Sequence, residues 1–295
     1  MWRNKKGRIR LFWKICIPVL VILYFLPLAF HFVPMGMTDL EVKKYFQDKK
    51  IPYTDSTVII DGVKVHFVAS GPDTGRLVVI VHGSPGSWTD LKDYLGDSNL
   101  AHKYRLLAFD RPGYGQSNRE GFAQLIDQAE VVAYFIDHRK NKSKVVVMGH
   151  SYGGPIAVKT ATIRPHEMAG LFLISPTISP EVEAGITVKR FMQHYSNSWL
   201  VKWMMPKMLL NSTKEMQPLP TEVQKMEPDY KKINCAVTEF HGTKDWMAPF
   251  GNQKYVKEKL TMANVKTIAI EEGDHFLIWS KHKEVVGELM LLLNR

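Results

Sequence analysis

The stretch 145–154 reads VVVMGHSYGG and carries the strongest structural signal in the chain. Its first half is a short, continuous apolar run, which is typical of a strand covered on both faces of a parallel sheet. Its second half has a G-x-S-x-G pattern made by Gly149, Ser151 and Gly153, and a helical stretch follows over 152–163. Glycines beside the serine permit a sharp turn from which the hydroxyl protrudes. We therefore expect a strand, a tight turn and a helix, with Ser151 at the turn as a candidate nucleophile.

Short apolar runs of the same kind recur along the chain and alternate with helical segments. The expected strands cover 58–60, 63–68, 77–81, 106–109, 145–148, 171–174, 236–240 and 265–270, and the expected helices cover 122–138, 152–163, 253–260 and 282–293. Asp61 and Gly62 separate the first two strands and predict a β-hairpin, because glycine supplies a positive φ. Alternating strands and helices indicate an α/β fold, with helices on both faces of the sheet.

The alternation is interrupted between Ile174 and Ala236 by about 60 residues without a strong strand, which is too long for a simple connection in a compact domain. We expect a helical cap over 177–234 that divides a catalytic core into 56–176 and 235–295. The chain has 295 residues, 45% hydrophobic and 23% charged. These values are close to those of folded soluble proteins, and they exclude a disordered, collagen-like or multi-span membrane protein.

The N-terminal part differs from the rest. Residues 15–33 read ICIPVLVILYFLPLAFHFV, have no formal charge and are long enough to cross a bilayer as a helix. We predict a transmembrane anchor there, after a basic flank over 1–14 and before a connector over 34–55 that has helical character at 37–50. A cleaved signal peptide and a buried helix are the alternatives. Because the basic residues precede the apolar run, the N-terminus is expected in the cytoplasm and the catalytic domain on the periplasmic or outer side of the cell (inner) membrane.

The net charge of +10 is concentrated in the same region. Before residue 34 there is no acidic residue but there are six basic ones, namely Arg3, Lys5, Lys6, Arg8, Arg10 and Lys14. The remainder is only slightly basic, which disfavours a nucleic-acid partner. The two cysteines, Cys16 and Cys235, allow neither a disulfide framework nor a cysteine-based metal site.

A serine nucleophile needs a base, and the base needs an acid that orients it. His275, in the motif GDHF after the last expected strand, is the predicted base. Asp245, on the loop after 236–240, is the predicted acid. The neighbouring Asp274 is a poorer candidate, because adjacent residues seldom aim their side chains at each other on a turn. An acid after the preceding strand, Glu181 or Glu183, is a second alternative.

Two backbone N–H groups are predicted to form an oxyanion hole. The Tyr152 N–H lies at the start of the helix after Ser151, and the Ser84 N–H lies in the glycine-rich motif HGSPGS at 82–87. We expect His82 to brace this loop and not to act as a second base. Asp110 and Arg111, in the motif FDRPGYGQS, are expected to be mostly architectural.

The motifs HGSPGS, FDRPGYGQS, GHSYGG, HGTKDWMAP and GDHF occur in this order. Together they make residues 56–295 resemble the α/β-hydrolase superfamily, in its capped esterase or peroxidase-like branch. The resemblance implies an eight-stranded, mostly parallel sheet with a helical cap after the sixth strand. Haloalkane dehalogenases and epoxide hydrolases share much of the pattern but use aspartate as nucleophile, so Ser151 argues against both.

The predicted activity is hydrolysis of a carboxylic ester or related small acyl substrate by a membrane-anchored serine hydrolase, with no metal and no other cofactor. Apolar cap side chains are expected to line the acyl pocket, to bury the cap on the core or to touch the membrane; the pocket candidates are Trp199, Trp203, Met204 and Met208. One alternative is an aminopeptidase of the proline-iminopeptidase kind, which would need acidic cap groups for a substrate ammonium; these are Glu181, Glu183, Glu215 and Glu222. Another is a non-catalytic, membrane-tethered binding protein.

Overall fold

Residues 14, 16–18, 36–118, 120–181 and 205–295 are described by a computed structural model of the chain. Their centre is one eight-stranded sheet with the strand order β1-β2-β4-β3-β5-β6-β7-β8. The strands are β1 (Tyr53–Ile60), β2 (Val63–Ser70), β3 (Leu77–Val81), β4 (Arg105–Phe109), β5 (Val145–His150), β6 (Met168–Ile174), β7 (Ala236–Gly242) and β8 (Asn264–Ile270). Only β1 with β2 and β2 with β4 pair antiparallel, and the other neighbours are parallel. The predicted α/β fold with a mostly parallel sheet is confirmed.

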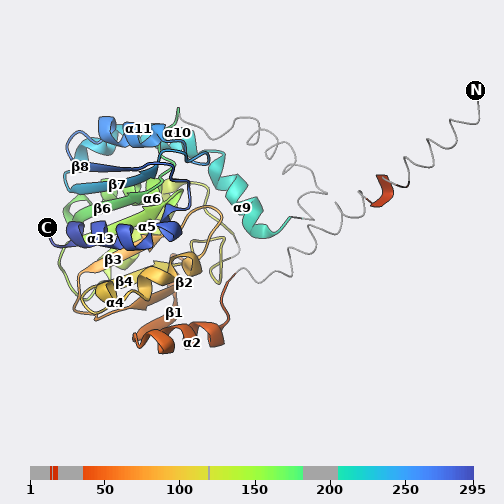
Figure 1. The fold of residues 1–295 in the computed structure, drawn as a ribbon, viewed down its shortest axis with the longest axis vertical. Coiled ribbons are helices and arrows are strands. Elements are labelled where there is room, and N and C mark those ends of the chain that lie inside the picture. The colour runs from red at the N-terminus through yellow and green to blue at the C-terminus, as the bar shows by residue number, and fades with distance from the viewer. Residues whose placement is uncertain (1–13, 15, 19–35, 119, 182–204) are drawn as a thin grey trace, which may run out of the picture.

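The sheet lies between two layers of helices (Figure 1). The described helices are α2 (Asp39–Lys49), α3 (Lys92–Leu95), α4 (Ser98–Ala101), α5 (Leu125–Asp137), α6 (Gly153–Ile163), α9 (Lys207–Met216), α10 (Leu219–Met226), α11 (Gly251–Lys259), α12 (Leu277–Ser280) and α13 (His282–Leu293). Short 3-10 helices are η1 (Trp88–Leu91), η2 (Pro165–Glu167) and η3 (Glu227–Lys232).

Alternate side chains of the central strands enter the two layers. Val79 and Val81 of β3 belong to the core cluster that includes side chains of α5, α6 and α11, whereas Val78 and Ile80 belong to a second cluster with side chains of α2, α12 and α13. All five residues of β3 are buried. This double coverage explains why the central strands appear in the sequence as continuous apolar runs rather than as alternating ones.

The edge strand β1 is longer than the sequence predicts. It begins at Tyr53, in the segment expected as a connector, and its first residues are polar and exposed. An edge strand with little buried surface carries neither a continuous nor an alternating apolar signal, so only its last three residues are recognisable. The hairpin at Asp61 and Gly62 is present, and both residues have positive φ, 48° and 81°.

The helix expected over 37–50 is α2, and it belongs to the packed domain. Thr38 caps its first turn, with reciprocal hydrogen bonds to Glu41. Val42 and Phe46 are buried in the layer that also holds α13. Lys50, in the left-handed conformation with φ 55°, ends the helix. The segment between the apolar N-terminal stretch and the catalytic core is thus attached to the sheet through α2.

Between β6 and β7 the chain forms α9, α10 and η3, where a helical cap is expected. Residues 182–204 of the same insert lie outside the described residues, as does most of the predicted anchor over 15–33. Of the helices that the structure does describe, none is both long and apolar enough to cross a bilayer.

Candidate active site

Ser151 occupies the sharp turn between β5 and α6. Its φ is 53°, a left-handed conformation that an L-residue adopts only when its surroundings impose it. The turn is tight enough that α6 starts against β3: a Cβ on Gly153 would lie 2.3 Å from the carbonyl oxygen of Val81. Glycine is therefore required at this position, and the fold holds Ser151 at the C-terminal edge of the sheet.

His275 and Asp245 lie on the loops that follow β8 and β7, at the same edge of the sheet. Their side chains meet, with His275 Nδ1 2.8 Å from Asp245 Oδ2. Burial opposes ionisation of Asp245, but the hydrogen bond and charge of His275 and the N–H of Ala248 outweigh it, so the pKa of Asp245 is lowered. Asp274 does not take this place, since its carboxylate accepts a hydrogen bond from the backbone N–H of Phe276.

His150, directly before the candidate nucleophile, joins this pair to the turn. Its Nε2 lies 3.2 Å from the carbonyl oxygen of His275, and the two imidazole rings are 5.1 Å apart between centroids. Burial, followed by the proximity of His275, lowers the pKa of His150 to about 3, so the ring is neutral and donates its Nε2 hydrogen to that carbonyl. The loop that carries His275 is thereby hydrogen bonded to the turn that carries Ser151. His150, which makes this bond, is not among the residues singled out from the sequence.

A second buried histidine, His241, lies close to the carboxylate of Asp245. Its Nδ1 is 2.7 Å from Glu239 Oε1, and its Nε2 is 2.7 Å from the carbonyl oxygen of Ala248 and 3.5 Å from Asp245 Oδ2. Burial disfavours a charge on His241, but the hydrogen bond and charge of Glu239 outweigh it and raise the pKa of His241. In its protonated form, His241 favours the ionised form of Asp245, which is the form that orients a catalytic imidazole.

The glycine-rich loop after β3 lies against the nucleophile. A Cβ placed on Gly83 would come within 3.1 Å of Ser151 Cβ and 3.4 Å of His150 Nδ1. In the part of the chain that the structure describes, no acceptor takes a hydrogen bond from the backbone N–H of Ser84 or of Tyr152. Among the described residues, both predicted donors thus lack an acceptor, and their role in an oxyanion hole stays a prediction.

His82 is fully buried at the start of this loop and occupies the bracing position expected from the sequence. Its Nε2 accepts a hydrogen bond of 3.1 Å from the Arg111 N–H, so Nδ1 carries the proton and donates to the Gly83 carbonyl oxygen at 2.8 Å. Burial and then the nearby Arg111 charge lower the pKa of His82 well below its usual value. His82 is thus a neutral part of the loop.

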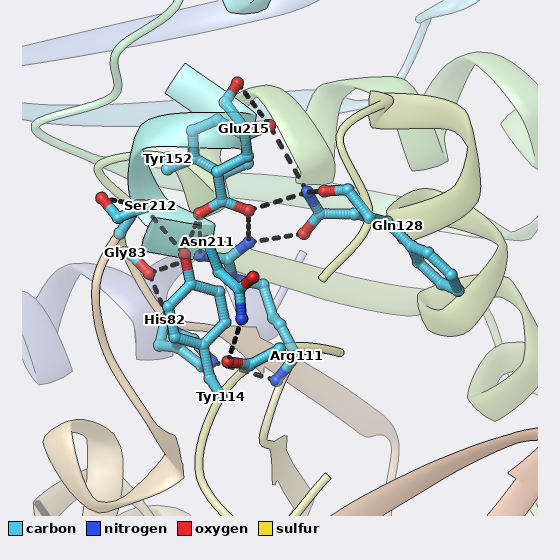
Figure 2. A network of polar contacts seen from close by, with 12 residues as sticks. His82, Gly83, Arg111, Tyr114, Gln128, Tyr152, Asn211, Ser212 and Glu215 are labelled. Atoms are coloured by element: carbon cyan, nitrogen blue, oxygen red, sulfur yellow. Dashed lines mark hydrogen bonds and ion pairs between the residues drawn. The ribbon is translucent and has the colours of Figure 1, made fainter. Parts of the chain in front are cut away.

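Asp110 has the structural role expected from the sequence, whereas Arg111 also connects the core to the cap. The Asp110 carboxylate accepts hydrogen bonds from the backbone N–H groups of Trp88 and Gln116 and contacts His66. Arg111, by contrast, is buried against the cap: its guanidinium hydrogen bonds to Gln128, to the Gly83 carbonyl and to both carboxylate oxygens of Glu215 on α9 (Figure 2).

Of the four predicted pocket residues, the structure describes Met208. Trp199, Trp203 and Met204 lie outside the described residues. Met208 lines a cavity of about 490 Å³ together with Trp88 and other residues of the loops after β3 and β4. Neither Ser151 nor His275 occurs among the described residues that line it. Met208 thus lies at this cavity, and the four pocket residues stay a prediction.

The sequence also matches known proteins that share this fold. Residues 76–234, more than half of the chain, match the model of the alpha/beta hydrolase fold family. The chain belongs to this family. Its chemistry is accordingly hydrolase chemistry of the α/β-hydrolase type.

Among curated relatives, the proline iminopeptidase PfmaB of Pestalotiopsis fici is 26% identical over 277 residues, covering 79% of this chain and 96% of that protein. Epoxide hydrolase B of Mycobacterium tuberculosis is 30% identical over 118 residues, 39% of this chain but only 33% of the relative. Several other relatives are likewise matched over about a third to a half of their length.

Solved structures share the fold at low sequence identity. A putative lipase from Acinetobacter baumannii superposes with a TM-score of 0.68 at 17% identity, covering 85% of this chain and 94% of the lipase. The 2-hydroxy-6-oxo-6-phenylhexa-2,4-dienoate hydrolase of a Rhodococcus species gives a TM-score of 0.68 at 15% identity, covering 83% of this chain and all of that one. These likenesses concern the fold and leave the substrate open.

Proposed function

We propose that the protein is a serine hydrolase that cleaves carboxylic esters, or related small acyl substrates, through a covalent acyl-enzyme. The observation that carries the proposal is Ser151, held with a φ of 53° at the β5–α6 turn, beside a loop whose histidine is hydrogen bonded to a buried aspartate. A nucleophile, a base and an orienting acid are the three groups that acyl transfer by a serine requires.

In the proposed reaction, Ser151 Oγ attacks the carbonyl carbon while Nε2 of His275 accepts its proton. The N–H groups of Ser84 and Tyr152 stabilise the oxyanion, and each such donor lowers the barrier by about 2.7–4 kcal/mol in comparable sites. Collapse of the tetrahedral intermediate expels the alcohol, which takes the proton from His275. Water then attacks the acyl-enzyme with His275 as base, releasing the acid and restoring Ser151.

An aminopeptidase is the second candidate, favoured by the similarity to the proline iminopeptidase. Such an enzyme needs a free carboxylate for the substrate ammonium. Glu215 is occupied by Arg111 and Tyr114, and the Glu222 carboxylate lies 3.1 Å from Lys225 Nζ. Glu181 is exposed, and Glu183 lies outside the described residues. Of the described acidic groups of the cap, Glu215 and Glu222 thus already pair with cationic side chains, which supports an ester substrate over a charged aminoacyl substrate.

A matched substrate panel tests the choice. Purified protein is assayed against p-nitrophenyl esters of increasing acyl length and against proline and alanine p-nitroanilides, with Ser151→Ala in parallel. The proposal predicts Ser151-dependent ester cleavage with kcat/KM at least about 100-fold above that of any aminoacyl anilide. Preferential cleavage of the proline anilide would establish the peptidase instead.

We also propose that residues 1–33 anchor the enzyme in the cell (inner) membrane, with the N-terminus in the cytoplasm and the catalytic domain on the periplasmic or outer side. The support is the sequence alone, namely the uncharged run 15–33 and the basic residues before it. A phosphatase reporter fused after Arg295 should be active only if the C-terminus is exported. Activity of a cytoplasm-restricted reporter at the same fusion point would contradict this topology.

A further inference from the structure

The peptide unit between Gly83 and Ser84 is held from one side. Its carbonyl oxygen accepts a hydrogen bond of 2.7 Å from Arg111 Nη2 and one of 2.8 Å from His82 Nδ1. This peptide is trans, and the C=O and N–H of a trans peptide point in opposite directions within one plane. Two donors on the carbonyl therefore also set the direction of the Ser84 N–H.

This direction matters because the peptide adjoins the candidate nucleophile. Gly83 is so close to the turn that a Cβ would lie 3.1 Å from Ser151 Cβ. A hydrogen bond weakens steeply once its N–H···O angle falls below about 120°, so a rotated peptide would no longer donate effectively to an oxyanion on Ser151. The groups that hold the carbonyl thus determine whether the Ser84 N–H can serve as an oxyanion donor.

Arg111 in turn is positioned by the cap. Its guanidinium lies between the rings of Tyr114 and Tyr152, at 4.7 and 4.9 Å from their centroids. Glu215 of α9 binds it through both carboxylate oxygens, at 2.7 and 2.8 Å, and Gln128 contacts it at 2.5 Å. Figure 2 shows the guanidinium enclosed by these groups. The exposed fractions of the Arg111 and Glu215 side chains are only 0% and 1%.

One face of α9 touches the loop after β3, which adjoins Ser151, and also the loop after β4. Ser84 Oγ donates to Ser212 Oγ at 2.9 Å, and the Asn211 amide donates to the Gly113 carbonyl oxygen at 2.8 Å. Residues 211, 212 and 215 lie on one side of α9, because positions three and four apart in a helix are neighbours. The Tyr114 hydroxyl completes the contact with a 2.6 Å hydrogen bond to Glu215.

We propose that Arg111 is a positioning residue for the oxyanion-hole peptide Gly83–Ser84, and that Glu215 of the cap holds Arg111 in its productive position. The oxyanion hole is then complete only when α9 is docked on the core. This inference rests on the proposed serine-hydrolase function and adds to it a physical link between the cap and the chemical step. It also gives Glu215 a role different from binding a substrate ammonium.

The test compares an ester with its thionoester, in which sulfur replaces the carbonyl oxygen. Sulfur accepts hydrogen bonds weakly, so the ratio of kcat/KM for ester over thionoester measures the oxyanion hole separately from overall folding. The variants are Glu215→Gln and Arg111→Lys, both of which keep much of the side-chain volume. The matched control is His66→Gln, which disrupts another buried ion pair near Asp110 without contacting Gly83.

The proposal predicts that Glu215→Gln and Arg111→Lys lower the ester-to-thionoester ratio by about tenfold, less than the 10²–10³-fold cost of losing a whole donor, while KM for the ester changes little. His66→Gln should lower the Tm and leave the ratio unchanged. If the two variants do not fold, Tyr114→Phe carries the test and should lower the ratio about threefold. It removes the hydroxyl that donates to Glu215 at 2.6 Å and lies 3.3 Å from Ser84 Oγ.

Labelling of Ser151 distinguishes a failure of the proposed function from a failure of the role proposed for Arg111 and Glu215. Wild-type protein is first treated with a fluorophosphonate, and labelling at Ser151 supports the proposed function. If Ser151 is labelled but the ratio is unchanged in every folded variant, the pair only stabilises the fold and the inference is overturned. If wild-type protein is not labelled at Ser151, the proposed function fails and the inference fails with it.

Discussion

Asp245 divides its two carboxylate oxygens between a turn and a histidine. Oδ1 accepts hydrogen bonds from the backbone N–H groups of Met247 and Ala248, at 2.9 and 2.8 Å, while Oδ2 lies 2.8 Å from His275 Nδ1. The turn hydrogen bonds fix the carboxylate before any substrate arrives. The imidazole is therefore held with Nδ1 on the aspartate side, which leaves Nε2 as the nitrogen for proton transfer.

Replacing Asp245 with asparagine should leave the fold intact and lower kcat for the best ester by about 10⁴-fold, because an amide favours the wrong imidazole tautomer. The measurement is steady-state kinetics on protein whose Tm has been checked. Asp274→Asn is the matched control, since Asp274 adjoins His275 but accepts a hydrogen bond only from the Phe276 N–H among the described residues. Equal losses in the two variants would show that Asp245 is not the orienting acid.

The positions of the triad candidates could be predicted because each lies in a short motif directly after a strand. Parallel strands bring their C-terminal ends to one edge, so local patterns around Ser151, Asp245 and His275 sufficed to place them in one region. The eight-stranded sheet was expected from the resemblance, and the covered strands were recognisable from their apolar runs.

Contacts between distant residues could not be predicted in this way. Arg111 and Glu215 are 104 positions apart, and nothing in either local sequence shows that the two side chains meet. The buried pair of His241 and Glu239 was missed for another reason: residues two apart on a strand face the same side, but a polar pair inside an otherwise apolar strand gives no periodic signal. The polar edge strand β1 was likewise only partly recognisable.

His66 should make the stability of the protein depend on pH. It lies between two carboxylates, with Nδ1 2.9 Å from Asp110 Oδ2 and Nε2 2.8 Å from Asp55 Oδ1. Burial disfavours its charge, but Asp110 and then Asp55 outweigh this and raise the pKa of His66. A group with a raised pKa in the folded state stabilises fully below its unfolded pKa, about 6.5, and this contribution is lost as the pH rises through the folded value.

The Tm of wild-type protein should therefore fall as the pH rises above about 6.5, and His66→Gln should have a lower Tm at pH 6 with a shallower decline. The pKa of His241 is also raised, so this residue contributes to stability in the same direction. A smaller decline in Tm is therefore expected to persist in His66→Gln. Thermal unfolding of both proteins across this range checks the expectation. Parallel curves for the two proteins would rule out His66 as a source of the pH dependence.

Two glycine-to-alanine substitutions should have opposite effects on stability. At Gly153 a Cβ would lie 2.3 Å from the Val81 carbonyl oxygen, so Gly153→Ala should lower the free energy of unfolding by about 1–3 kcal/mol. At Gly287, in α13, nothing lies within 4 Å of the added Cβ. Gly287→Ala should raise the free energy of unfolding by about 0.5–1 kcal/mol, because alanine is the better helix former.

Denaturant unfolding of the two variants and the wild type measures both effects under one set of conditions. A neutral Gly153→Ala would mean that α6 does not approach β3 as closely as described, and the sharp turn at Ser151 would lose its structural basis. A destabilising Gly287→Ala would contradict the open surroundings of that helix position.

The central claim is that Ser151 is a nucleophile activated by His275 and Asp245. Its most direct test is a fluorophosphonate reaction followed by intact-mass and peptide mass spectrometry on wild type, Ser151→Ala and His275→Ala. We expect one adduct per wild-type chain, located on Ser151, with no adduct on Ser151→Ala. Labelling of His275→Ala should be at least about 10³-fold slower, since an unactivated serine is a weak nucleophile. An adduct on another residue, or an equal rate without His275, would contradict the claim.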